Sequence, residues 1–118
     1  MTNGEILRRY QDLKNVSGCT GTLGWYVYKN LKILKDAIEP YTQAHNDLII
    51  KYGGSETVEV PKENRPAFST ECLVLLGIEQ DIELVRMKRP QFDQIVKSQK
   101  EITAETMLIL DENIVEEW

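Results

Sequence analysis

The sequence predicts a mainly α-helical (α+β) domain: a helical hairpin with one long central helix, a small two-stranded antiparallel β element and a short C-terminal helix. Three observations support this prediction. An apolar stripe at heptad spacing runs from Val27 to Tyr52, a capped amphipathic segment precedes it, and two short strand-like segments follow it. A length of 118 residues suits a single domain, which we assign to residues 1–118.

The first helix is predicted over residues 3–15. Thr2 is an N-cap residue, and Glu5 follows three positions later, which is the arrangement of a capping box. An apolar face at helical spacing follows, made of Ile6, Leu7, Tyr10 and Leu13. The stretch SGCTGT then ends the helix, because glycine and hydroxyl residues favour turns.

The long central helix is predicted over residues 24–52. Its apolar stripe is separated by steps of three and four residues and consists of Val27, Leu31, Leu34, Ile38, Tyr41, His45, Leu48 and Tyr52. Gly53 and Gly54 supply the left-handed cap that ends it. The stripe is longer than the first helix can cover. Either the C-terminal half of the chain covers the remainder or a second copy does, as in a homodimer.

Pro40 lies inside this helix. An interior proline removes one backbone hydrogen bond and costs about 3 kcal/mol. The apolar stripe nevertheless keeps its register on both sides of Pro40. We therefore expect one helix that is kinked near residues 36–40, with two helices meeting at Glu39 and Pro40 as the alternative.

The second half of the chain contains the predicted β element. TVEV (57–60) alternates like a strand, and DIELVRM predicts a second strand over 81–86. A helix over 64–77 lies between them, with Asn64 as its cap, Pro66 in its first turn and Gly77 as its stop. Its apolar face is made of Phe68, Cys72, Leu75 and Leu76.

After Pro90, residues 91–100 are polar and are expected to form a loop. Thr103 is expected to cap a short last helix that carries Met107, Leu108 and Leu110.

Four stretches of the chain resemble short, uncharacterised proteins encoded by tailed phages and prophages. The stretches are TNGEILRRYQDL, YKNLKILKDAIEPY, FSTECLVLLGIEQDIEL and ITAETMLILDENIVEE. None of them is a catalytic signature. What the resemblance implies is a context, the cytoplasm of a bacterial host cell, and a small protein that acts by binding.

The composition agrees with a soluble protein. No run approaches the roughly 20 apolar residues of a membrane span, and the start MTNGEILRRY lacks the apolar core of a signal peptide. The net charge is −5, with the acidic residues concentrated in the second half, which disfavours nucleic acid as a partner. Arg86, Lys88 and Arg89 form the densest basic cluster, and this cluster is alternatively a partner for the acidic C-terminal end of the same or a neighbouring chain.

No set of residues with catalytic spacing is found. Cys19 and Cys72 are expected to be free thiols, since they have neither metal-ligand spacing nor the density of a disulfide scaffold. His45 is the only imidazole, and we interpret it as a structural residue of the apolar stripe, with metal binding or a pH-sensitive contact as alternatives. The alternating carboxylates Glu79, Asp81 and Glu83 are interpreted as the solvent face of the second strand.

The sequence therefore predicts a non-enzymatic protein that acts through protein–protein interaction, in assembly, regulation or host-factor binding. No catalytic residue, cofactor, metal site or small-molecule ligand is predicted. The candidate partner-binding residues are Tyr41, His45, Leu48, Tyr52 and Trp118. The alternatives are a small metal- or thiol-dependent enzyme and a nucleic-acid-binding regulator built on the basic cluster.

Overall fold

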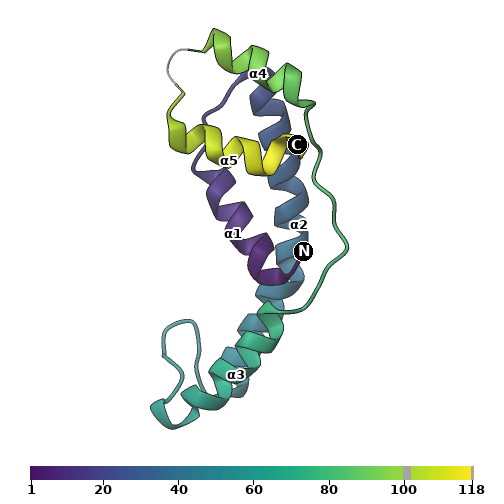
Figure 1. The fold of residues 1–118 in the computed structure, drawn as a ribbon. Coiled ribbons are helices and arrows are strands. Elements are labelled where there is room, and N and C mark those ends of the chain that lie inside the picture. Colours follow the sequence, from purple (N-terminus) through teal and green to yellow (C-terminus); the bar gives the residue numbers. More distant parts are fainter. Residues whose placement is uncertain (100–101, 118) are drawn as a thin grey trace.

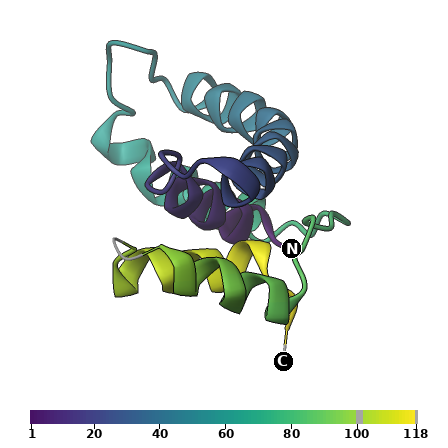
Figure 2. The same ribbon diagram turned by 90° about the horizontal axis from the view of Figure 1, so that it is seen from above.

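The computed structural model describes residues 1–99 and 102–117, and the chain is mainly helical. Its elements are α1 (Asn3–Lys14), α2 (Gly21–Lys51), the 3₁₀-helix η1 (Lys62–Asn64), α3 (Arg65–Leu76), α4 (Arg89–Ser98) and α5 (Ala104–Ile114). Helix α1 runs antiparallel to the first half of α2, and α3 lies along its second half (Figure 1). Helices α4 and α5 lie together on one side of the α1–α2 pair (Figure 2). The expected helical hairpin with a long central helix is confirmed.

The molecule is long and thin, with principal extents of 55 × 27 × 19 Å and a radius of gyration of 17.7 Å. A compact chain of this length would have a radius of gyration of about 13–14 Å. The excess length comes from an arm that projects from the rest of the molecule (Figure 1). We define the arm as residues 38–77, which include the second half of α2, the loop at its tip and α3, and the remainder as the body.

The helix ends follow the predicted capping residues closely. The Thr2 hydroxyl accepts a hydrogen bond from the Glu5 amide at 3.1 Å, and the Thr103 hydroxyl accepts one from the Thr106 amide at 3.1 Å. Gly53 has a φ of +88° just after the end of α2, in the left-handed region that was expected there. Asn64 precedes α3 as predicted, but its side chain donates to the Tyr52 carbonyl at 3.0 Å and so caps the end of α2.

Helix α2 continues through Pro40, so the alternative of two separate helices is wrong. Both views show that α2 is curved, with its second half leaning away from the direction of the first (Figures 1 and 2). Proline lacks the amide that would bond the carbonyl four residues earlier, which loosens the helix on that turn. The next carbonyl, that of Ala37, accepts a hydrogen bond from Gln80 Nε2 at 2.9 Å. The segment that follows α3 is thereby attached to α2 at the bend.

The hydrophobic core lies in the body. The buried face of α2 consists of Leu23, Val27, Asn30, Leu34 and Ala37. The predicted stripe contributes its Val27 and Leu34 to this face, whereas Leu31 and Ile38 are half-buried and pack against the core from its edge. Buried residues from α1, α4, α5 and the connecting segments complete the core: Ile6, Leu13, Val16, Leu84, Met87, Phe92, Leu110, Ile114 and Val115.

The predicted two-stranded β element is wrong. Among the described residues there are only two isolated bridges, Thr2 with Glu79 and Met87 with Val115, and no strand. Residues 57–60 lie in the loop at the tip of the arm, whereas residues 81–86 run in an extended conformation along the body (Figure 1). The two segments lie in different parts of the molecule and cannot pair.

A side chain takes the place of the missing strand partner. Asn30 Oδ1 accepts from the Val85 amide at 2.7 Å, and Asn30 Nδ2 donates to the Val85 carbonyl at 2.8 Å. This amide group thus bonds one residue of the extended segment in both directions, as a neighbouring strand would. Asn30 Nδ2 also donates to the Asn113 carbonyl at 2.9 Å, so one buried side chain joins α2, the extended segment and α5.

The loop predicted over residues 91–100 is also wrong, because residues 89–98 form α4. Pro90 lies in the first turn of this helix, where its missing amide costs no hydrogen bond. Phe92 is buried, and Ile95 and Val96 are half-buried three and four positions later, so the helix has an apolar face within a largely polar sequence. The last of the predicted loop positions, Lys100, lies outside the described residues.

Candidate functional site

Four of the five predicted partner-binding residues lie together on the arm, and the fifth, Trp118, lies outside the described residues. The four are Tyr41, His45, Leu48 and Tyr52, and all are half-buried. The rings of Tyr41, His45 and Tyr52 form a row with the ring of Phe68 in α3. The ring centroids are 5.8 Å apart for Tyr41 and His45, 6.0 Å for His45 and Phe68, and 6.1 Å for Tyr52 and Phe68. Helix α3 of the same chain therefore covers much of this part of the stripe.

Helix α3 is held in place at its middle and at its C-terminal end. At its middle, Lys51 Nζ of α2 lies 2.9 Å from Glu71 Oε1. Near the body, Asn3 Nδ2 donates to the Leu75 carbonyl at 2.8 Å, and the Asn3 amide donates to the Ile78 carbonyl at 3.0 Å. The first bond satisfies a carbonyl in the last turn of α3 that has no partner within the helix, and the second holds the residue two positions after its end. The orientation of α3 on α2 is thus fixed, and so is the face that it turns to solvent.

The face of α3 that is turned to α2, its inner face, is the apolar face predicted from the sequence. Phe68, Cys72, Leu75 and Leu76 are all half-buried, as is Glu71. Leu75 also lines an open depression of about 400 Å³ together with Leu48, Val74 and Ile78. No residue within α3, which the structure describes in full, is completely buried, because the helix has only one neighbour over most of its length.

The outer face of α3 is apolar and exposed. It consists of Pro66, Ala67, Thr70, Leu73 and Val74 together with Gly77, the residue directly after the helix, and we call it the outer face below. Leu73 is 70% exposed and Val74 is 66% exposed. The Thr70 hydroxyl donates to the Pro66 carbonyl at 3.0 Å, so its polar group is already satisfied within the helix. The result is an uncharged surface over three helical turns in a chain whose residues are 28% charged.

Sequence reasoning missed the outer face, although a signal for it was present. Over residues 66–78 the only charged residue is Glu71, and it lies on the inner side. A surface helix normally has a polar face opposite its apolar face. A helix without a charged face is either buried or available for a partner, and only the structure shows that this one is not buried.

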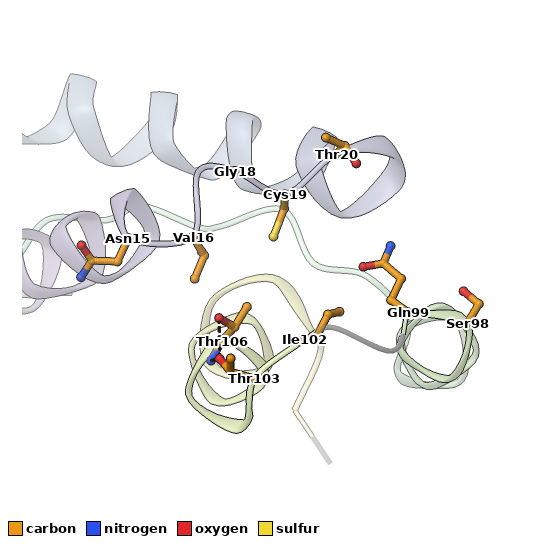
Figure 3. Close-up of a pocket in the computed structure, with 10 residues that line it drawn as sticks. All are labelled: Asn15, Val16, Gly18, Cys19, Thr20, Ser98, Gln99, Ile102, Thr103 and Thr106. Carbon is orange, nitrogen blue, oxygen red and sulfur yellow. Dashed lines mark hydrogen bonds between the residues drawn. The ribbon is translucent and has the colours of Figure 1, made fainter.

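A second depression lies at the other end of the molecule, where the α1–α2 turn meets the start of α5. It has a volume of about 650 Å³, and its wall is mostly uncharged and polar, with Asn15, Thr20, Thr103 and Thr106 among its residues. The Cys19 side chain points into it (Figure 3). Burial raises the pKa of the Cys19 thiol, which keeps it protonated and therefore a poor nucleophile at neutral pH.

The thiol of Cys72 also has a raised pKa. Burial, followed by the nearby charge of Glu71, raises the pKa of Cys72. Cys72 lies on the face of α3 that is turned to α2, yet no hydrogen bond joins it to His45. Both cysteines are free, as predicted.

The basic cluster and the acidic C-terminal segment pair within the same chain. Arg89 Nη2 lies 2.8 Å from Asp111 Oδ1, and Arg86 Nη1 donates to the Glu112 and Val115 carbonyls, each at 2.9 Å. Arg8 Nη2 adds a contact of 2.7 Å to Glu112 Oε1. Of the alternatives for this cluster, pairing with the acidic end of the same chain is the one the structure shows.

The carboxylates Glu79, Asp81 and Glu83 are exposed on the extended segment. In the part of the chain that the structure describes, no group of three or more His, Cys, Asp or Glu side chains is placed to hold a metal ion. None of the helices in this part is both long and apolar enough to cross a bilayer.

The comparisons with known proteins give no relative. No family model matches the chain, and neither a curated protein nor a solved structure resembles it significantly.

Proposed function

We propose that this chain is a non-enzymatic interaction protein whose arm binds an apolar protein surface through the outer face of α3. The resemblance noted in the sequence leads us to propose further that it does so in the cytoplasm of a bacterial host. The observation that carries the proposal is the exposure of Leu73 and Val74 on a helix face without any charge.

Leu73 and Val74 contribute little to the stability of the isolated chain. Full burial of a Leu or Val side chain stabilises a protein by about 1.5–3 kcal/mol. Leu73 and Val74 give up most of that contribution in the isolated chain, since they are 70% and 66% exposed. A polar residue at either position would leave the packing of α3 on α2 intact. Their apolar character is explained if a partner buries them.

The chemistry of the thiols also supports a binding role. A cysteine nucleophile needs a neighbouring base or cation that lowers its pKa. The pKa values of Cys19 and Cys72 are instead both raised, chiefly by burial. His45 is in contact with the rings of Tyr41 and Phe68 and makes no hydrogen bond to Cys72.

Site-specific photo-crosslinking in bacterial cells tests the proposal. A photoreactive amino acid is placed at Leu73, and a matched probe is placed at Leu108, which is equally exposed at 70% but lies on α5 in the body. We expect protein adducts at position 73 that are absent or at least tenfold weaker at position 108. Equal adducts at the two positions, or none at position 73, would contradict the proposal.

A further inference from the structure

The partner of the outer face can be identified from the pattern of side chains along α3. The exposed positions at the centre of this face are Pro66, Thr70, Leu73 and Gly77, separated by four, three and four residues. That spacing is the one by which two helices pack along a common seam. The sizes of these four side chains determine which residues of an opposite helix can pack against them.

The side chains of these four positions are complementary in size to the same four positions of a second copy, when the two copies are related by a twofold axis. If two α3 helices lie antiparallel with the axis between positions 71 and 72, Thr70 of one copy faces Leu73 of the other, and Pro66 faces Gly77. A large side chain then meets a small one at each of the four contacts. In a twofold-symmetric pair each contact occurs twice, once in each direction. The Thr70–Leu73 and Pro66–Gly77 contacts therefore account for all four.

The charge distribution favours the same partner. Burying an unpaired charge is costly, so an uncharged face selects an uncharged partner face. This chain has a net charge of −5, and its exposed surface carries most of its 33 charged residues. The outer face of α3 is a surface through which two copies can meet without burying any of those charges. The antiparallel arrangement also places the N-terminal end of one helix dipole beside the C-terminal end of the other.

The shape of the molecule permits this contact. Helix α3 runs from the tip of the arm back towards the body (Figure 1). In an antiparallel pair each body therefore lies beyond the tip of the other arm, and the two bodies point apart. The paired molecule is longer than the 55 Å of one chain.

We infer that the chain forms a twofold-symmetric homodimer in which the outer faces of two α3 helices pack antiparallel around Thr70 and Leu73. This inference rests on the proposed function, and it identifies the partner that binds the outer face of α3 as a second copy of the chain. A single pair of three-turn helices forms a small interface, below the roughly 1,200 Å² typical of stable complexes. The dimer is therefore concentration-dependent, with dissociation in the micromolar range or above.

Sedimentation of the full chain with paired charge variants tests the inference. We expect the wild-type chain to pass from monomer to dimer as its concentration rises. Leu73→Glu and Leu73→Lys should each raise the dissociation constant at least tenfold, because two like charges then lie within a helical turn of each other at the interface. An equimolar mixture of the two variants should regain the dimer, because position 73 of one copy lies within a helical turn of position 73 of the other.

The controls separate this inference from the proposed function. Leu108→Glu changes an equally exposed leucine in the body and should leave the dissociation constant unchanged. Far-ultraviolet circular dichroism establishes that each variant remains folded. A wild-type chain that stays monomeric at millimolar concentration, or variants that fail to recover on mixing, would overturn the homodimer. The proposed function would still stand if position 73 crosslinks to a different protein.

Discussion

Asn30 shows how one side chain can organise several segments of a small fold. It is completely buried, and its amide group makes three hydrogen bonds, to both backbone groups of Val85 and to the Asn113 carbonyl. Buried polar groups are tolerated where their hydrogen bonds are complete. The extended segment therefore obtains from one side chain the pairing that the sequence suggested it would obtain from a second strand.

Replacing Asn30 by Ala should lower the free energy of unfolding by about 3 kcal/mol. The change leaves the Val85 amide and the carbonyls of Val85 and Asn113 without these partners, and a buried group that loses its partner costs about 1–3 kcal/mol. Urea denaturation followed by circular dichroism measures the effect. Asn46→Ala on the same helix is the control, since Asn46 is exposed and its loss should cost less than about 0.5 kcal/mol. Equal midpoints for the two variants would contradict this account of Asn30.

Glu112 makes the stability depend on pH. The hydrogen bond from Arg8 is the largest cause that lowers the pKa of Glu112, and the charges of Arg8, Arg9 and Arg86 add to it. A carboxyl with a lowered folded-state pKa stabilises the fold above its unfolded-state pKa of about 4.3, and this stabilisation is lost as the pH falls through the folded-state value.

We therefore expect Glu112→Gln to be less stable than the wild type at pH 7 by about 1 kcal/mol or less, because the pair is half-exposed. The difference should shrink as the pH falls below about 4.3. Denaturation at a series of pH values measures it. Glu56→Gln, in the exposed loop of the arm, is the control. A difference that is constant from pH 7 to pH 3 would show that Glu112 contributes by packing and not by its charge.

At the scale of elements, helices whose ends carry their own capping residues were predicted well. Residues 3–15 and 24–52 were expected, and α1 and α2 span 3–14 and 21–51. Helix α4 was missed because residues 91–100 are largely polar and therefore suggested a loop. Its apolar face has only Phe92, Ile95 and Val96, which is a short signal within a polar segment.

Phe92→Ala tests whether α4 belongs to the core. Phe92 is 5% exposed, and truncation of a buried phenylalanine costs about 3–5 kcal/mol. We expect a loss of about 3 kcal/mol in the free energy of unfolding, measured by denaturant titration. Gln94→Ala, at an exposed position of the same helix, should change it by less than about 0.5 kcal/mol. A similar small effect for both variants would mean that α4 is not docked on the body.

At the scale of the whole molecule, the body and the arm differ in how they are stabilised. The body contains nearly all of the buried residues, whereas α3 contains none that is completely buried. Regions with few buried apolar contacts open locally at lower free energy than the core does. The arm is therefore expected to be the least stable part of the fold and the most responsive to a partner.

Hydrogen–deuterium exchange measures this difference directly. In dilute solution we expect the amides of α3 to exchange at least tenfold faster than those at the centre of α1. Raising the protein concentration should slow exchange in α3 while leaving α1 unchanged, since pairing of the outer faces would protect only the arm. Amides of α3 that are as protected as those of α1 in dilute solution would contradict the division into a stable body and a weaker arm.

The sequence by itself determined the features that depend on neighbours within one or two helical turns. These are the caps at Thr2 and Thr103, the left-handed glycine after α2 and the inner face of α3. Each is set by hydrogen bonds or side-chain spacing between residues close in the chain. For the candidate site, it determined that Tyr41, His45, Leu48 and Tyr52 share one face.

Only the tertiary structure decided which segment packs against each apolar face. The extended segment bonds Asn30, 55 residues away in the chain, where a strand was expected. The predicted site residues are half-buried by α3, and the exposed apolar surface is instead the far side of that helix. Periodicity identifies a face that avoids water, but which segment covers it depends on how distant parts of the chain pack. That choice placed Leu73 and Val74 at the surface.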